Sequence, residues 1–428
     1  MQNVKKSINE ILSLTGQKII GINPPVYDFS FADLWSKPMG LLYLLEKLKR
    51  NGNEVFLLDS IHEGSSQIKT YGRARIDSVE INKPPVYQGI KRRYHRFGLG
   101  TEEIRKKLLA IGKPDVVFLT SLMTYWYGGV KEIIDLTREI FDDTPIILGG
   151  IYAKLCPKHT ETLAADYIVT DNWLPDVPYP AMNLYENITY GVTMTSFGCP
   201  LSCEYCASNI LWPTFYKRNI AEVLGEIEMQ NNLGATDFAF YDDALLLNKE
   251  AYSYPLFEKI SAFYKSSIRL HTPNGLHVRE IDAKCAEMLK STNFVTLRLS
   301  LESIDTEIAR TGSDKVKWNE YESAVKNLLN VGYSTNDCET YILLGLPGQR
   351  LKSVKDTIRF VRDCGGKPKL AEFSPIPGTV TFAHAVKEIP ALATEPLLHN
   401  NSVYSSWISK NMEPEELQEL KDLASRKA

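Results

Sequence analysis

The feature that most restricts the fold of this chain is a repeated alternation of short apolar runs with amphipathic helical stretches. An apolar run from Lys18, a helical pattern that ends at Gly52 and the run EVFLLD predict a strand, a helix and a strand. The same order returns after Thr101, with the runs DVVFLTSL and PIILGG as strands. Such alternation indicates a parallel doubly wound sheet that binds ligands at the carboxyl ends of its strands. We therefore expect a first α/β domain over residues 16–155.

A second α/β region begins at Gly191. It contains six apolar runs separated by helical stretches: GVTMTSFG, TDFAFYDD, IRLHTPNG, VTLRLSLES, TYILLGLPG and KLAEFSPIPG. Six such units in about 190 residues predict a partial (β/α)6 barrel, similar to a TIM barrel that is not closed, over residues 191–382. Residues 156–190, which are rich in proline, are expected to link the two domains. Residues 383–428 are expected to form a short helical extension whose helix packs against the open barrel edge.

Composition and charge restrict the partners of the chain. Its 428 residues are 44% hydrophobic and 24% charged, with a formal net charge of -3, so bulk charge predicts no nucleic-acid binding. No stretch approaches eighteen consecutive apolar residues, and the N-terminal segment lacks the unbroken apolar run of a secretory signal. We expect a soluble, cytoplasmic protein without a membrane-spanning segment.

The segment between Ser65 and Thr101 has weak periodicity and is expected to be a long loop. It holds eight Lys and Arg residues against two Asp and Glu residues, including the run Lys91, Arg92, Arg93, Tyr94, His95 and Arg96. Long loops inside compact domains are often functional. The segment is therefore either a solvated basic loop or a flap over an anionic cofactor or substrate.

Three of the seven cysteines stand close together, in the order C-x-x-x-C-x-x-C, and they are Cys199, Cys203 and Cys206. Thiolates on one short loop can bind three irons of a four-iron cluster and leave the fourth iron open for a substrate or cofactor. Zinc is the alternative, but it usually takes four protein ligands, and no second Cys or His pair follows at a suitable spacing. The other four cysteines are scattered singly, as expected for small buried apolar side chains.

The triplet, with aromatic Tyr205 before the last cysteine, resembles the signature of the radical S-adenosylmethionine (SAM) enzymes. In that family SAM chelates the open iron of a 4Fe-4S cluster, and reductive cleavage gives a 5'-deoxyadenosyl radical that abstracts hydrogen from the substrate. The resemblance implies that Cys199, Cys203 and Cys206 bind the cluster and that Tyr205 lies against the adenine. It also implies oxygen sensitivity and a low-potential electron donor, flavodoxin or ferredoxin.

Other strand ends resemble the SAM-binding positions of the family. The implied contacts are, in chain order, Asp242 and Asp243 near the methionyl amino group, Ser300 and Glu302 near the ribose or amino acid moiety, Gly345 and Leu346 in the turn on the adenine side, and Pro375 at the sixth strand end. Each has a structural alternative, since Asp243 could cap a helix and the two turns could be ordinary tight turns.

The first domain resembles the cobalamin-binding domain of the cobalamin-dependent subgroup of this family. The matching turns hold Ser121 and Leu122 after the third strand and Gly149 and Gly150 after the fourth. Small residues there let a flat macrocycle approach the backbone. A Rossmann-like helper domain would use similar turns. His62 stands one residue later than the cobalt-binding histidine of the Asp-x-His-x-x-Gly motif, counted from Asp59, so the comparison predicts base-off cobalamin with a weak protein ligand or none.

The resemblance implies a cobalamin-dependent radical SAM enzyme that methylates an unactivated carbon of a small-molecule or peptide substrate. A radical SAM enzyme of other chemistry, such as cyclisation, rearrangement or carbon–carbon coupling, is an alternative in which cobalamin has another role or is absent. A non-catalytic iron–sulfur or corrinoid carrier is a third hypothesis. Failure to cleave SAM would favour the carrier.

Overall fold

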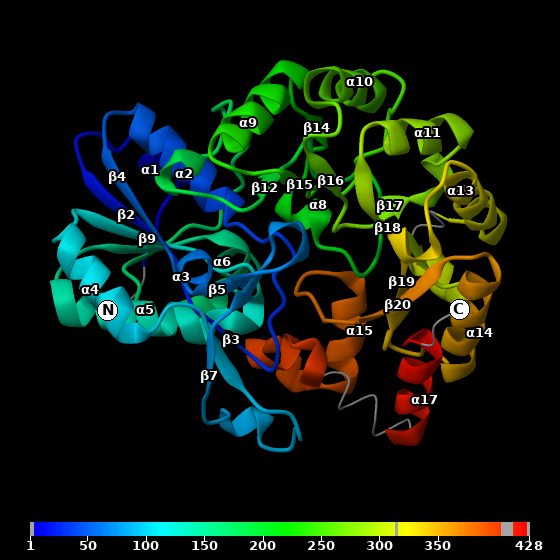
Figure 1. Ribbon diagram of the computed structural model, residues 1–428. Helices are drawn as coiled ribbons and strands as arrows, with labels where there is room; N and C mark the ends of the chain where they lie inside the picture. The colour runs from blue at the N-terminus through cyan, green and yellow to red at the C-terminus, as the bar shows by residue number, and fades with distance from the viewer. Residues whose placement is uncertain (1–3, 313–315, 404–413, 426–428) are drawn as a thin grey trace. The chain divides into compact units, whose positions relative to one another are not determined.

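The computed structural model describes residues 4–312, 316–403 and 414–425 (Figure 1). The chain divides into two compact units. Unit 1 contains residues Met1–Thr189 together with Pro390–Asn400, and unit 2 contains Tyr190–Ile389 together with Asn401–Ala428. Each unit is built around its own parallel sheet.

The sheet of unit 1 has six parallel strands in the order β1-β11-β10-β9-β2-β4. Their bounds are β1 (Val4–Lys5), β2 (Lys18–Asn23), β4 (Glu54–Asp59), β9 (Val116–Leu119), β10 (Ile146–Leu148) and β11 (Tyr167–Ile168). The strand order reverses between β2 and β9, which makes this the ligand-binding switch point of a doubly wound sheet. The predicted doubly wound fold is confirmed, while β1 and β11, at one edge, were not predicted.

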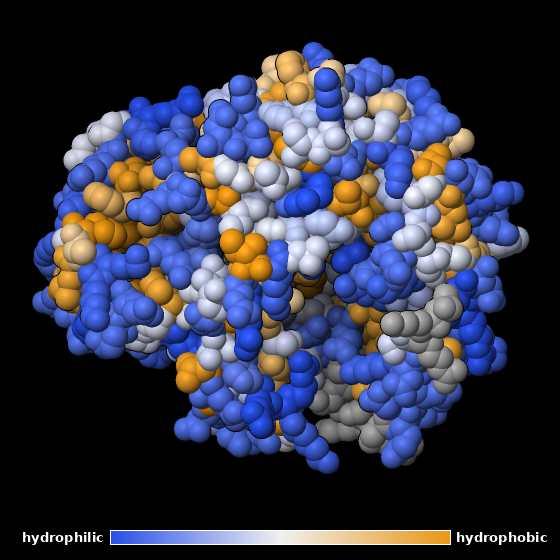
Figure 2. Space-filling model, in the orientation of Figure 1, coloured by the Kyte–Doolittle hydropathy of each residue, from blue (hydrophilic) through white to orange (hydrophobic). Residues whose placement is uncertain are grey.

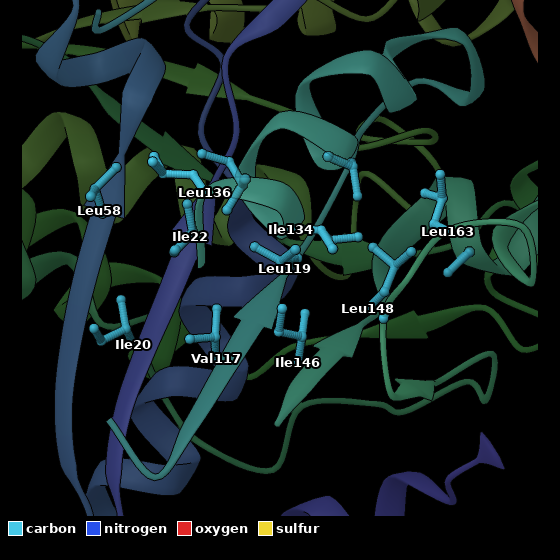
Figure 3. Packing of buried hydrophobic residues seen from close by; sticks show 14 of the residues in the cluster. Ile20, Ile22, Leu58, Val117, Leu119, Ile134, Leu136, Ile146, Leu148 and Leu163 are labelled. Atoms are coloured by element: carbon cyan, nitrogen blue, oxygen red, sulfur yellow. The ribbon is translucent and has the colours of Figure 1, made fainter. Parts of the chain in front are cut away.

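Helices cover both faces of this sheet. Their bounds are α1 (Ile8–Leu12), α2 (Met39–Arg50), α3 (Ser60–Glu63), α4 (Thr101–Ile111), α5 (Tyr127–Phe141), α6 (Gly150–Leu155) and α7 (Pro157–Thr160). On one face, β-branched and leucine side chains of β2, β9 and β10 pack against α5, as the labelled side chains in Figure 3 show. On the other face, Ile19 and Phe118 pack with Leu41, Leu45 and Leu48 of α2. Because both faces are covered, β9 is buried at all four positions.

The segment between Ser65 and Thr101 differs from the predicted loop, because it folds into short strands. These are β5 (Ser65–Ile68), β6 (Ala74–Ile76), β7 (Ser78–Glu80) and β8 (His95–Phe97). β8 pairs with both β7 and β3 (Val26–Asp28) in an antiparallel sheet. Arg96 is buried on β8 and forms an ion pair of 2.8 Å with Glu132 of α5. That arginine is therefore a structural residue of unit 1.

The main sheet of unit 2 contains the six predicted strands, parallel and in sequence order, from β12 to β20. Their bounds are β12 (Gly191–Thr193), β15 (Asp237–Phe240), β16 (Arg269–His271), β18 (Phe294–Glu302), β19 (Cys338–Leu344) and β20 (Lys367–Glu372). The short strand β17 (Leu276–His277) adds to β18. This is the expected partial barrel, with β12 at one edge and β20 at the other.

The helices of unit 2 follow the strands. They are α8 (Ser208–Leu211), α9 (Ile220–Asn232), α10 (Ser253–Tyr264), α11 (Ala283–Ser291), α12 (Thr306–Thr311), α13 (Trp318–Asn330), α14 (Leu351–Asp363), α15 (Val380–Glu388) and α17 (Pro414–Ser425). α17 packs beside β20, where Lys421 forms an ion pair of 3.2 Å with Glu372. The C-terminal helix therefore covers the edge strand of the barrel, as expected. Residues 404–413 and 426–428 of the predicted extension lie outside the described residues.

The division into units differs from the predicted boundaries at two places. Residues 156–189 belong to unit 1, because β11 extends its sheet and Tyr185 donates a hydrogen bond of 2.6 Å to Asp59. Pro390–Asn400 also belongs to unit 1, although it lies far away in sequence. There His399 contacts Thr124 at 2.9 Å, and Asn400 donates to Asp28 at 2.9 Å.

No helix among the described residues has the length and apolar character that crossing a bilayer requires. The face in Figure 2 is mostly hydrophilic, with hydrophobic residues scattered over it. Scattered apolar residues are usual on protein surfaces.

Candidate functional site

The three clustered cysteines lie on a loop closed at its base by a small hairpin. β13 (Ser196–Phe197) pairs antiparallel with β14 (Tyr216–Lys217), so residues 198–215 form one loop that also contains α8. The cysteines therefore follow β13, a two-residue strand outside the main sheet, and β12, the first strand of the barrel, ends three residues before β13 begins. The hairpin holds the two ends of the loop together.

The surroundings of the Cys206 thiol show that the cysteines lie near one another. Desolvation is the main cause that raises its pKa to about 11, and the charges of Asp243, Cys203 and Cys199 act in the same direction. The backbone N–H of Ser208 opposes them by donating to the sulfur at 3.4 Å. Across the described residues, no three His, Cys, Asp or Glu side chains converge on a point that could hold one metal ion. The ligands of a four-iron cluster need no such convergence, since each binds a different iron.

Gly312, just after α12, brings the cysteine loop close to the end of β18. Its carbonyl accepts a hydrogen bond from the Cys203 thiol at 3.4 Å. A Cβ at Gly312 would lie 3.2 Å from the Tyr205 hydroxyl and 3.6 Å from Glu302 Oε2. The structure therefore gathers Cys203, Tyr205 and Glu302 around one glycine. The sequence analysis missed Gly312, because nothing in the local pattern relates it to the cysteine loop.

The acidic pair after β15 divides into two roles. Asp242 is buried and accepts hydrogen bonds from the Thr195 N–H at 3.0 Å, the Thr195 hydroxyl at 2.6 Å and the Ser196 hydroxyl at 2.6 Å. Both hydroxyls bond Oδ1, and the Thr195 N–H is shared between the two oxygens, so Asp242 anchors the start of the cysteine loop. Asp243 accepts a hydrogen bond from Ser208 of α8 and caps no helix. Burial is the main cause that raises the pKa of Asp243.

Ser300 and Glu302 lie at the carboxyl end of β18, as predicted. Glu302 has a φ of 70°, which is rare for a residue with a side chain, and the register with β19 shifts just before it. A Cβ at Gly275 would lie only 2.0 Å from Ser300 Oγ, so the turn after β16 approaches that hydroxyl closely. Backbone strain of this kind often occurs at functional sites.

Gly345 and Leu346 form the turn after β19, and Pro375 follows the neighbouring strand β20. The Gln349 side chain closes the turn by accepting from the backbone N–H of Gly345 at 2.7 Å and of Leu346 at 3.3 Å. Gly345 has a φ of 99°, a conformation that favours glycine. The segment after Pro375 reaches the cysteine loop, because the Thr381 N–H donates to the Glu204 carbonyl at 3.0 Å.

Lys217, which the sequence analysis also missed, lies at the base of the cysteine loop on β14. Its ammonium lies 4.3 Å from the centre of the Tyr252 ring and 3.5 Å from the Leu245 carbonyl. Burial lowers the pKa of Lys217 to about 8, although the charge of Asp242 acts in the opposite direction. A half-buried lysine at a strand pairing could not be distinguished from a surface lysine by sequence alone.

In unit 1, the predicted turns lie together at the carboxyl ends of β9 and β10. Ser121 is buried and Leu122 is 41% exposed, as is its apolar neighbour Met123 at 39%. Gly150 has a φ of 83°, and a Cβ there would lie 2.3 Å from the Thr120 hydroxyl, whereas a Cβ at Gly149 would meet nothing closer than 3.9 Å. The turns thus form a glycine-lined edge with exposed apolar side chains beside it.

His62 lies on α3, where it is half-buried beside Lys37 and Tyr185. Its Nδ1 is 2.9 Å from the Lys37 ammonium, and its ring packs edge-on against Tyr185 at 4.7 Å. Burial and the charge of Lys37 lower the pKa of His62 to about 4, although Asp59 and a hydrogen bond with the Asn187 backbone act in the opposite direction. A neutral histidine with contacts to Lys37 and Asn187 is already engaged within the domain.

The comparison with known families agrees with this geometry. Residues 193–361 match the model of the Radical SAM superfamily. This part of the chain is similar to a radical SAM domain. The matched region runs from the end of β12 into α14 and includes the cysteine loop, Asp242, Asp243, Ser300 and Glu302.

Solved structures of radical SAM enzymes resemble most of the chain. The radical SAM methyltransferase TsrM from Kitasatospora setae, solved with cobalamin and a 4Fe-4S cluster, matches with a TM-score of 0.66 and 15% identity over 89% of this chain and 79% of that one. The cobalamin-dependent radical SAM enzyme OxsB, solved with aqua-cobalamin and SAM, matches with a TM-score of 0.59 and 11% identity over 96% of this chain and 62% of that one. At these identities the likeness establishes the fold.

Curated proteins match over part of their length. Cytidylyl-2-hydroxyethylphosphonate methyltransferase of Streptomyces wedmorensis is 20% identical over 67% of this chain and 65% of its own length. An uncharacterized methyltransferase of Pyrococcus horikoshii is 24% identical over 49% of this chain and 47% of its own length. The chain therefore spans about half to two thirds of these relatives.

Proposed function

We propose that this protein is a cobalamin-dependent radical SAM methylase. The observation that carries the proposal is the combination, in one chain, of a doubly wound unit and a partial barrel with three neighbouring cysteines on its entry loop. TsrM and OxsB, which share the fold, are both described as cobalamin-binding or cobalamin-dependent radical SAM enzymes. When bound, the cluster would supply the electron that cleaves SAM, and cobalamin would supply the methyl group.

The cysteine loop suits a 4Fe-4S cluster bound by Cys199, Cys203 and Cys206. The three sulfurs are near enough to influence one another electrostatically, and Asp242 with the β13–β14 pair fixes the loop at its base. A rigid base reduces the freedom that the loop would lose on binding the cluster. The thiol of Cys206 would be deprotonated by iron, since a bound metal ion lowers the pKa of a coordinating thiol.

We assign SAM binding to the residues at the carboxyl ends of the barrel strands. Tyr205 and Glu302 already face the same glycine beside Cys203, and Asp243 lies next to Cys206. The other residues assigned to SAM are Ser300, Gly345, Leu346 and Pro375. Because Asp242 is buried and accepts from Thr195 and Ser196, we assign it to holding the loop and not to contacting the methionyl amino group.

The edge of unit 1 suits cobalamin bound without a protein ligand to cobalt. Exposed Leu122 and Met123 offer an apolar surface beside the turn of Gly149 and Gly150, where a macrocycle could approach the backbone. The Nδ1 atom of His62 contacts the Lys37 ammonium, and the ring also forms a hydrogen bond with the Asn187 backbone, so His62 is not available to cobalt. We therefore expect a base-off spectrum.

The proposal includes a small-molecule or peptide substrate, a flavodoxin or ferredoxin as electron donor and a cytoplasmic location. Methyl transfer to an unactivated carbon requires a radical at that carbon, which SAM cleavage provides in this enzyme class. The protein would orient the substrate and exclude water and competing donors.

The deciding experiment is corrin and SAM chemistry on protein produced anaerobically with added cobalamin. We expect about one corrin per chain, a base-off absorption spectrum and formation of 5'-deoxyadenosine under low-potential reduction. Alanine at any one of Cys199, Cys203 or Cys206 should abolish SAM cleavage. Cys285→Ala, at a buried cysteine of α11, is the matched control and should not.

The outcomes separate the alternatives. SAM cleavage without corrin binding would replace the methylase with a radical SAM enzyme of other chemistry. Corrin and cluster binding without SAM cleavage would favour a carrier protein. Cleavage that survives loss of a triplet cysteine would contradict the assignment of the cluster.

A further inference from the structure

The inward face of the last three barrel strands carries a group of cationic side chains. The alternation of side chains along the strands identifies this face. On β19, Thr340 bonds Tyr321 of α13 at 2.7 Å, and on β20, Glu372 pairs with Lys421 of α17, so these residues face the outer helices. Glu339, Lys367 and Lys369 have the opposite parity on the same strands and therefore face the barrel interior.

Three cations converge there on one carboxylate. Glu339 lies 2.6 Å from Arg298 of β18, 2.9 Å from Lys367 and 3.3 Å from Lys369, measured from carboxylate oxygen to side-chain nitrogen. One carboxylate neutralises one of the three positive charges, so the cluster keeps an excess of two. These cations hold the pKa of Glu339 below its ordinary value even though burial acts to raise it, so the carboxylate is charged at neutral pH.

The cluster combines a fixed part with an accessible part. The side chains of Arg298 and Glu339 are only 11% and 15% exposed, which fixes the pair between β18 and β19. Lys367 and Lys369 are 43% and 42% exposed, so a dissolved anion can reach their ammonium groups. A structural ion pair would need Arg298 alone, because one guanidinium already satisfies one carboxylate.

We propose that Lys367, Lys369 and Arg298 form a binding site for the anionic group, phosphoryl or carboxylate, of the substrate. This proposal rests on the proposed function and specifies the class of substrate that the barrel would bind. Lys369 and Lys367 lie three and five residues before the carboxyl end of β20, which places the anion roughly 10–17 Å below the strand ends where SAM is expected. The substrate is therefore an anionic small molecule whose reacting carbon lies at some distance from its charged group.

The test measures anion binding to the reconstituted holoenzyme by anaerobic calorimetry at constant ionic strength. Inorganic phosphate and acetate are the two probes, and the tighter one identifies the phosphoryl or the carboxylate source. The double variant Lys367→Gln/Lys369→Gln should weaken binding of the tighter probe by about tenfold or more, as expected when two charged donors are lost. Glu339→Gln should strengthen it several-fold, because it removes the competing carboxylate.

The matched control is Lys352→Gln/Lys421→Gln, which makes the same charge change on the outer helices α14 and α17. It should leave anion binding within about twofold, since Lys352 and Lys421 are paired with Asp356 and Glu372 and do not contact Glu339. Equal losses in both double variants would overturn the proposal, as would a wild-type protein that binds neither probe.

SAM binding and cleavage form the second readout. Both should be unchanged in Lys367→Gln/Lys369→Gln. A selective loss of SAM affinity would assign the cations to the SAM carboxylate and overturn the substrate site. A holoenzyme that binds the anion but never cleaves SAM would instead overturn the proposed function and leave the anion site in place.

Discussion

Asp59 and Asp242 occupy comparable places in the two units. Asp59 ends β4 of unit 1, and Asp242 follows β15 of unit 2 by two residues. Both are buried, and both accept several hydrogen bonds. Each carboxylate thus holds connecting segments together at the carboxyl edge of a parallel sheet, which is the edge where doubly wound sheets and barrels bind ligands.

The two differ in what they hold. The donors to Asp242 come from two adjacent residues, Thr195 and Ser196, so it fixes a single point at the start of the cysteine loop. Asp59 caps α3 and also accepts from Asn23 and Tyr185, so it joins three separate segments. The comparison teaches that the barrel site depends on one local anchor, whereas the edge of unit 1 depends on a distributed network.

Asp242→Asn should have the largest effect. The amide cannot accept from both the Thr195 N–H and the two hydroxyls, so at least one buried donor is left unpaired at a cost of about 1–3 kcal/mol. We expect lower iron content per chain and at least about tenfold slower SAM cleavage, with corrin content unchanged. Parallel iron and corrin analyses test this. Equal loss of both cofactors would show that Asp242 supports the whole chain and not the loop.

Asp59→Asn should have a smaller effect on the opposite cofactor. Asn remains a good cap for α3 but loses the acceptor for the Tyr185 hydroxyl, which costs about 1 kcal/mol. Corrin binding should weaken while iron content stays at the wild-type level. A drop in iron content would break the separation of the two networks.

The acid side of the stability profile should report on the Asp59 network. The pKa of His62 is lowered to about 4, so between its ordinary value of 6.5 and pH 4 the unfolded chain binds more protons than the folded one. Stability is therefore lost as pH falls through that window, by on the order of 1–2 kcal/mol. His62→Gln should flatten this loss. Unfolding midpoints measured at pH 7 and pH 4.5 test it, and an unchanged slope in the variant would contradict the assignment.

The stability of the protein at alkaline pH should depend on Lys217, which lies near Asp242. The pKa of Lys217 is lowered to about 8 from 10.5, so the folded protein loses this proton first and stability rises as pH increases between these values. We expect a gain on the order of 1–2 kcal/mol from pH 7.5 to 9.5. Lys217→Met, which keeps the stem without the charge, should remove that gain. A variant that keeps the rise would place its source elsewhere.

His62→Gln should have the smallest effect on the corrin. Because the ring is engaged with Lys37 and Asn187, the absorption spectrum of bound cobalamin should not change. A spectral shift on substitution would show that His62 reaches the cobalt after all.

The sequence predicted the features that depend on neighbours in the chain. The strand and helix alternation followed from local periodicity, and the cysteine loop was visible because its three thiols lie within eight residues. The hydrogen bonds of Asp242 with Thr195 and Ser196 could not be predicted, because they depend on how two strands align and Ser196 lies 46 residues before Asp242. The contacts of Gly312 with Tyr205 and of Lys37 with His62 could not be predicted for the same reason, since neither pair has a recognisable spacing in the sequence.

Short elements were missed for a different reason. β1, β11 and the β13–β14 pair contain two residues each, which is too few to show a period of two. The strands β5 and β7 are exposed at every position and therefore show no apolar alternation, and β6 and β8 contain three residues each, which is too few to show one. Pro390–Asn400 packs in unit 1 through contacts with residues far away in the sequence, and no local sequence pattern predicts this.

The position of Pro390–Asn400 in unit 1 affects the order in which the two units can fold during biosynthesis. Unit 1 is almost complete when Thr189 leaves the ribosome, yet Asp28, Thr124 and Tyr87 receive partners from a segment made roughly 200 residues later. At about 5–20 residues per second, translation takes roughly 10–40 s to deliver it. During that interval most of unit 2 is synthesised, so unit 1 can complete its fold only after nearly the whole barrel has been made.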